Sequence, residues 1–158
     1  MPLPEEITKF IGQTISSTTY EVEKGAIARF AEAVGDPNPL YWDEEYARKS
    51  RYGSIIAPPG FFGWPVRRRG EPSGDLMTLG ANLAKAGYGR ILDGGVEWEF
   101  LKPIRVGDKL TVTSVIKNIV ERSGRTGKTV FMFREITHTA QNGETVATAR
   151  QTTIHPAG

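Results

Sequence analysis

The segment from Phe30 to Ala47 reads FAEAVGDPNPLYWDEEYA and decides how the first half of the chain is organised. Gly35 directly follows an apolar helical pattern, at the position where glycine commonly ends a helix. Asp36 and Asn38 stand in the turn-forming sequence Gly-Asp-Pro-Asn-Pro, because both side chains hydrogen-bond their own backbone. Asp43 is a residue type that begins helices. The segment therefore predicts two helices separated by a tight turn.

Other elements of the first half lie on either side of that segment. Residues 14–22 are rich in β-branched side chains and predict a strand. Residues 23–34 carry apolar side chains at three- and four-residue spacings, which predicts an amphipathic helix, and a short helix follows from Asp43 to Ala47. The sequence Pro58-Pro59-Gly60 interrupts the chain before an apolar helix start over 61–66. Residues 70–90 contain several glycines and a proline and are expected to form a loop.

The second half of the chain is predicted to consist of strands. Apolar and polar residues alternate over 95–101, which places Val96, Trp98 and Phe100 on one face. After a turn at 103–108, the expected strands are 109–120, 129–139 and 144–154, with hairpin loops at 123–127 and 141–143. Three long antiparallel strands after a helical segment favour an α+β domain with its helix packed against one face of the sheet.

Length and composition are those of a globular protein. The 158 residues suit one domain spanning 1–158, and 39% of them are hydrophobic. The net charge of +2 comes from 20 basic and 18 acidic residues, which gives no reason to expect a nucleic-acid partner. No apolar run is long enough for a membrane span, and the first eight residues do not resemble a signal peptide. The absence of cysteine excludes disulfides and fits a cytoplasmic protein.

Three segments, in order along the chain, resemble the MaoC-like hydratase and dehydratase family. They are the Gly35–Ala47 region, the sequence IIAPPG at 55–60 and the sequence EWEFLKPIRVGD at 97–108, and the likeness extends over roughly residues 10–153. The resemblance implies a hot-dog fold, in which an antiparallel sheet wraps a long central helix and two such units pair into a longer sheet. It also implies that the ligand is an enoyl or 3-hydroxyacyl thioester.

The resemblance makes Asp36, Asn38 and Tyr41 the candidate catalytic positions, with Asp36 in a vestigial or alternative role. In catalytic members, an aspartate and a histidine five residues later bind the water that is added to, or eliminated from, C3 of the acyl chain. Here Asp36 is present, but Tyr41 stands where the histidine is expected. A phenol with a pKa near 10 is a poor base, and bringing it to neutrality takes ~4 kcal/mol of differential stabilisation. The neighbouring carboxylates oppose its ionisation. We therefore interpret this site as catalytically deficient and Tyr41 as a pocket wall or packed side chain.

The remaining candidate residues concern binding. The resemblance places a backbone N–H at Gly60, after Pro59, opposite the thioester carbonyl, although these residues can equally be a simple helix start. Phe61 and Trp64 are candidates for core or for the wall of an acyl tunnel. Three arginines can meet the phosphates of coenzyme A or phosphopantetheine, or simply form a solvated face: Arg67, Arg68 and Arg69.

The function that these residues favour is a subunit of an (R)-specific enoyl-CoA hydratase or 3-hydroxyacyl-thioester dehydratase. It would bind an acyl-CoA or acyl-carrier-protein thioester, while a MaoC-like partner supplies the complete aspartate–histidine pair. Whether this chain is itself an enzyme stays open. The alternatives are a self-sufficient hydratase for an unusual acyl-CoA, a non-enzymatic thioester binder and, less favoured, a hot-dog thioesterase. No metal or other cofactor is expected, because cysteine is absent and the two histidines lack ligand spacing.

Overall fold

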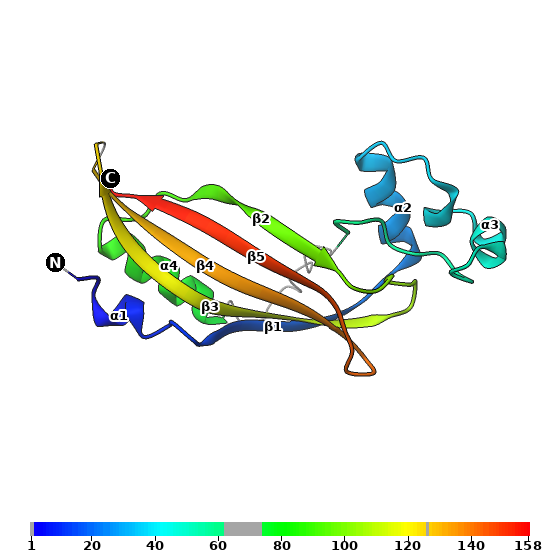
Figure 1. The fold of residues 1–158 in the computed structure, drawn as a ribbon, viewed down its shortest axis with the longest axis horizontal. Helices are drawn as coiled ribbons and strands as arrows, with labels where there is room; N and C mark the ends of the chain where they lie inside the picture. Colours follow the sequence, from blue (N-terminus) through cyan, green and yellow to red (C-terminus); the bar gives the residue numbers. More distant parts are fainter. Residues whose placement is uncertain (1, 62–73, 126) are drawn as a thin grey trace.

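One antiparallel sheet organises this chain, and its computed structural model describes residues 2–61, 74–125 and 127–158. The strand order across the sheet is β1-β3-β4-β5-β2 (Figure 1). The strands are β1 (Thr14–Glu21), β2 (Leu92–Phe100), β3 (Lys109–Gly124), β4 (Gly127–Ala140) and β5 (Thr145–Pro156). The hairpins predicted from the sequence join β3 to β4 and β4 to β5, so the longest strands lie in the middle of the sheet.

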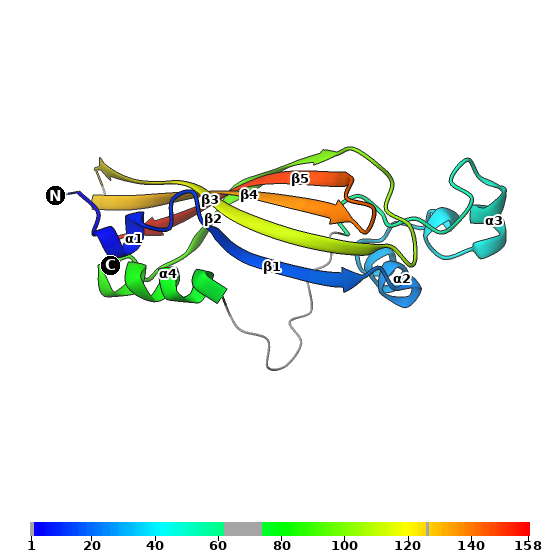
Figure 2. The same cartoon turned by 90° about the horizontal axis from the view of Figure 1, so that it is seen from below.

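The helices occupy two separate places along this sheet. They are α1 (Glu5–Thr8), α2 (Lys24–Ala33), the 3₁₀ turn η1 (Pro39–Tyr41), α3 (Glu44–Lys49) and α4 (Gly74–Lys85). Figure 2 shows α1 and α4 on one side of the sheet near the chain termini, whereas α2 and α3 lie at its opposite end. This five-stranded antiparallel sheet with few helices has the hot-dog architecture that the sequence predicts, in the α+β class.

Burial alternates along the central strands and distinguishes two faces of the sheet. In β4 the buried side chains are Val130, Met132 and His138, all separated by even numbers of residues. We call this face, against which α4 lies, the inner face. The opposite, outer face carries cross-strand hydroxyl pairs such as Thr19–Thr111 at 2.9 Å, together with half-buried aromatic rings such as Phe131, over which Arg122 lies. The period of two in the sequence therefore corresponds to one covered and one solvated face.

Two hydrophobic clusters form the core at opposite ends of the molecule. The α4 cluster comprises residues from α1, α4 and the adjoining ends of the strands: Ile7, Phe10, Ile15, Leu79, Leu83, Tyr88, Ile116, Ile119, Val130 and Met132. The α2 cluster comprises residues from α2, α3 and the connections around them: Val22, Ile27, Ala31, Tyr41, Ala47, Ile55, Ile56, Phe61, Ile104, Leu110 and Val146.

The structure corrects the sequence analysis at two places. Residues 70–90 were expected to be a loop, but Gly74–Lys85 is the helix α4, whose Leu79 and Leu83 are completely buried. The burial of that apolar face outweighs the low helix propensity of Gly80. The last strand was expected to end at residue 154, yet β5 continues to Pro156 and buries His155. Across the described ranges, no helix has the length and apolarity needed to cross a membrane.

Candidate functional site

The turn after α2 has the local geometry that its sequence predicts. Gly35 has a positive φ of 71°, and the N–H of Asp36 donates to the carbonyl of Ala31 at 2.9 Å, which closes the helix in a Schellman-type end. Asp36 Oδ1 accepts from the N–H of Asn38, and Asn38 Oδ1 accepts from the N–H of Leu40, both at 3.1 Å. Both side chains thus brace the turn, which is what Gly-Asp-Pro-Asn-Pro alone requires.

Tyr41 follows this turn as a packed side chain. It is 6% exposed and belongs to the α2 cluster. Burial raises the pKa of the Tyr41 phenol, and the negative charge of Asp36 raises it further, while a hydrogen bond with Asn38 acts in the opposite direction. A base that works near neutral pH needs a pKa close to that pH. The environment of Tyr41 moves its pKa away from that range.

Main-chain hydrogen bonds bring together the three segments that carry the family resemblance. The N–H of Ala57 donates to the carbonyl of Ile104 at 2.8 Å, and the N–H of Val106 donates to the carbonyl of Ile55 at 3.0 Å. The N–H of Ile56 reaches the carbonyl of Leu40 at 3.3 Å. Segments as distant in the sequence as those around Leu40 and Ile104 therefore meet next to the η1 turn.

A groove of about 500 Å³ opens where these segments meet. Its volume falls within the usual range for sites that bind small molecules, roughly 300–1,000 Å³. Its walls consist of residues from the η1 turn, the end of α3, the segment 56–59 and the connection from β2 to β3: Asn38, Leu40, Tyr41, Arg51, Tyr52, Ile56, Ala57, Pro58, Pro59, Phe100, Leu101, Lys102, Pro103 and Ile104. Most of these side chains are apolar, so the groove suits an apolar chain with a polar end.

Two cations stand at this groove that the sequence analysis did not single out. The guanidinium of Arg51 lies 4.8 Å from the centre of the Tyr52 ring, and its Nη2 donates to the Tyr52 hydroxyl at 2.6 Å. Lys102 forms an ion pair with Glu144. The sequence alone does not identify Arg51 and Lys102 as site residues, because they become neighbours only when residues 51–52 fold against residues 101–104.

Only some of the other predicted site residues line the groove. Pro59 lines the groove, as do Asn38 and Tyr41. Gly60 has a positive φ of 89°, and Phe61 is buried in the α2 cluster with its ring edge-on to Phe30 at 5.6 Å. Four further predicted residues lie outside the described residues: Trp64, Arg67, Arg68 and Arg69.

Both histidines are buried, and neither is among the described residues that line the groove. His138 is buried on the inner face, 5.5 Å from the ring of Trp98, and burial lowers its pKa to about 4. His155 is buried at the other end of the sheet, where its Nε2 lies 3.1 Å from the Thr153 hydroxyl. In the described part of the chain, no three histidine, aspartate or glutamate side chains gather as a metal site would require.

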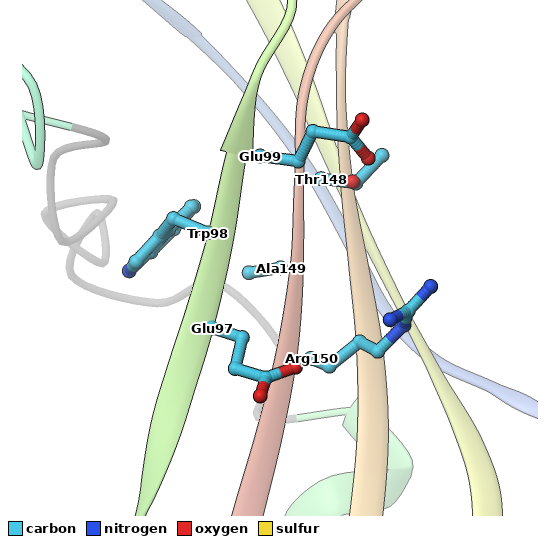
Figure 3. A pocket seen from close by; sticks show the side chains of 6 residues that line it. All are labelled: Glu97, Trp98, Glu99, Thr148, Ala149 and Arg150. Carbon is cyan, nitrogen blue, oxygen red and sulfur yellow. The ribbon is translucent and has the colours of Figure 1, made fainter.

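A second, smaller depression lies on the outer face between β2 and β5. Figure 3 shows Glu97, Glu99 and Arg150 around it, with Trp98 projecting from the opposite side of β2. Its volume of about 120 Å³ is below the range expected for a ligand pocket. The view confirms the predicted alternation along β2, with the glutamates on the outer face and the aromatic ring on the inner one.

Sequence comparison now adds to this geometry. Residues 9–149 match the model of the "FAS1-like, dehydratase domain region". The chain belongs to this FAS1-like dehydratase family. A UPF0336 protein of Streptomyces avermitilis is 40% identical over 117 residues, which cover 73% of this chain and 74% of that protein. A probable enoyl-CoA hydratase alpha subunit of Thermomonospora curvata is 33% identical over 132 residues, which cover 78% of this chain but only 41% of the relative.

Solved structures share the hot-dog architecture of this FAS1-like dehydratase chain. The ChsH1–ChsH2 complex from Mycobacterium tuberculosis contains a chain that superposes with a TM-score of 0.83 at 20% identity, covering 97% of this chain and 95% of that one. The C-terminally truncated HadBC (3R-hydroxyacyl-ACP dehydratase) complex from the same organism gives a TM-score of 0.66 at 23% identity, covering 94% and 98%. At these identities the likeness concerns the fold.

Proposed function

We propose that this chain is the acyl-thioester-binding subunit of an (R)-specific enoyl-CoA hydratase or 3-hydroxyacyl-thioester dehydratase, completed by a MaoC-like partner chain. The proposal depends on the position, burial and raised pKa of Tyr41. It occupies the position of the family's histidine, is buried in the α2 cluster, and has a pKa raised by burial and by Asp36. Hydration needs a group that accepts a proton from water near neutral pH. Tyr41 does not meet that need.

The groove beside Tyr41 supports a role in binding. Its apolar walls suit an acyl chain or the pantetheine arm, and Arg51 supplies positive charge for a phosphorylated carrier, whereas Lys102 is already paired with Glu144. Arginine recognises phosphate through two parallel hydrogen bonds. Among the described side chains, no carboxylate forms an ion pair with Arg51, so its charge is available to a ligand.

The edge of the sheet supports a role for a partner. Among the described residues, strand β2 pairs with β5 alone and leaves its other edge open, and it exposes the large apolar side chains of Leu92, Val96 and Phe100. An open apolar edge strand is a ready surface for another chain. Two of the solved proteins with this fold, ChsH1–ChsH2 and HadBC, are themselves complexes of two chains.

The test compares hydration of an enoyl-CoA by the purified chain alone and by the chain co-purified with a MaoC-like neighbour from the same genome. We expect no turnover above background without the partner and clear turnover with it. Tyr41→Phe removes the phenol hydroxyl but keeps the ring, a nearly volume-conserving core change that the fold should tolerate, so the complex should keep its turnover. Asp43→Asn is the control variant in the same segment: it keeps a good capping group for α3 and should leave turnover unchanged.

Three outcomes would contradict the proposal. Robust turnover by the chain alone that disappears in Asp36→Asn would make it a self-sufficient hydratase. Saturable thioester binding without turnover, even with the partner, would make it a non-enzymatic binder. A loss of turnover in Tyr41→Phe by a factor of a hundred or more would give the phenol a catalytic role.

A further inference from the structure

A group of polar side chains lies on the inner face of the sheet between the two hydrophobic clusters, and three of them, Arg134, Gln151 and Ser114, are near neighbours. Arg134 of β4 is paired in register with Gln151 of β5, and the two share a rung of the sheet. Ser114 of β3 stands opposite Ile136, one rung further along the same face. These strands are the central three of the sheet, so the polar strip lies away from both edges.

Arg134 is a half-buried cation with an incomplete set of partners. Its Nη2 donates to the side-chain oxygen of Gln151, but its Nε is buried without a hydrogen-bond partner. Burial also lowers the pKa of its guanidinium. Within the described ranges, no carboxylate forms an ion pair with Arg134. Buried charges are ordinarily paired, because the loss of hydration is otherwise uncompensated.

Ser114 is a second, independent polar group without a partner. It is 4% exposed, and its hydroxyl oxygen has no hydrogen-bond partner among the described residues. Residues on a diagonal of adjacent strands are within reach of a long side chain such as arginine. The strip therefore combines a charged donor with a neutral hydroxyl that donates equally well, and it contains no acidic residue.

We propose that Arg134, Ser114 and Gln151 form a binding site for a carboxylate at the far end of an acyl chain. A carboxylate is a monoanion and accepts two parallel hydrogen bonds from a guanidinium, so it matches the one charge present. A phosphate dianion would bury an excess negative charge. A partner chain that docks along β2 reaches the edge of the sheet, whereas the strip lies on its central strands.

The distance from the groove is compatible with this assignment, which rests on the proposed binding of acyl thioesters. Phe100 lines the groove, and Val96, four residues earlier in β2, is paired with Gln151. Four residues of strand correspond to about 13 Å. An acyl chain that enters at the groove and follows the inner face would bring its far end to Arg134. The preferred ligand would then be an ω-carboxyacyl thioester of medium length.

The test measures binding of two matched pairs of ligands to the full chain by calorimetry. The first pair is decanedioyl-CoA and decanoyl-CoA, which differ in the terminal carboxylate. The second pair is decanoate and decanol, which probe the same site without any carrier. We expect the carboxylate to improve affinity by about tenfold in each pair, which corresponds to 1.4 kcal/mol. Arg134→Gln should abolish both preferences, and Arg134→Lys should keep part of them.

Arg150→Gln is the control, because Arg150 is exposed on the outer face of β5 and should leave both preferences unchanged. Circular dichroism and urea unfolding establish that each variant is folded. Equal affinity within both pairs in the unaltered protein would overturn the inference, as would preferences that survive in folded Arg134→Gln. A preference for decanoate over decanol that needs Arg134, with no binding of either CoA thioester, would keep the anion site and reject the proposed function.

Discussion

The two ends of the molecule are built differently. At the α4 end, two helices cover the inner face of the sheet, and the α4 cluster contains only apolar side chains apart from the Tyr88 hydroxyl. At the α2 end, the helices lie beyond the strands and are tied to the sheet by main-chain hydrogen bonds such as Ala57 to Ile104. The groove lies at this second end.

We expect the two ends to differ in local stability, and the proposed binding lies at the α2 end. Continuous apolar burial gives the α4 end its share of the global free energy of unfolding. The α2 end combines short helices, turns and a groove that is open to solvent, which are the features of segments that open locally at lower free energy. A ligand that binds at the groove would stabilise this end more than the other.

The largest expected effect comes from breaking the α4 cluster. Leu79→Ala removes a completely buried side chain and should lower the free energy of unfolding by about 2–5 kcal/mol, as core leucine truncations do. Met77→Ala on the same helix is the control, because Met77 is 59% exposed and should change stability by less than about 0.5 kcal/mol. Urea denaturation measures both. Equal losses in the two variants would show that α4 does not depend on this buried face.

The sequence predicts the parts of this fold whose signals are local. The C-terminal glycine of α2, the Asp43 cap and the hairpin at 141–143 each follow from a few adjacent residues, and the structure confirms all three. Helix α4 escapes that reading because Gly74 and Gly80 are typical of loops. The spacing of Leu76, Leu79 and Leu83 was the signal that could have revealed it.

The candidate site was predictable to a smaller extent. Asn38, Tyr41 and Pro59 do line the groove, whereas Arg51 and Lys102 reach it only through tertiary folding. The same is true of Arg134, since nothing in the sequence distinguishes a half-buried arginine of a strand from an exposed one. Their functional roles remain predictions to be tested by binding.

An effect of intermediate size is expected from His138, the buried histidine at the boundary between the two ends, on the pH dependence of stability. Burial lowers the pKa of His138 to about 4, against an ordinary value near 6.5. The unfolded chain therefore binds more protons below pH 6.5, and stability should fall as the pH decreases. One unit of pH corresponds to at most about 1.4 kcal/mol, so the loss between pH 6.5 and 5 should be at most about 2 kcal/mol.

The measurement is urea unfolding at pH 8, 6.5 and 5 for the unaltered chain and for His138→Gln. The substitution removes the titrating group, so the slope below pH 6.5 should become smaller. His155 is also buried, and burial lowers its pKa in the same direction, so some slope should persist in the variant. An identical slope in both proteins would assign the acid sensitivity to groups other than His138.

The smallest expected effect tests the α2 end through the cap of α3. Asp43 Oδ1 accepts hydrogen bonds from the N–H groups of Glu45 and Tyr46, both at 3.0 Å. Asp43→Ala should cost about 1 kcal/mol, whereas Asp43→Asn keeps a good capping group and should cost little. Because α3 lies at the α2 end, which we expect to open locally, Asp43→Ala should speed amide hydrogen exchange over residues 44–49 and weaken ligand binding at the groove. The global free energy of unfolding should change little. A drop in the global free energy of unfolding as large as that of Leu79→Ala would mean that both ends unfold as one unit. The separation between a stabilising end and a binding end would then be wrong.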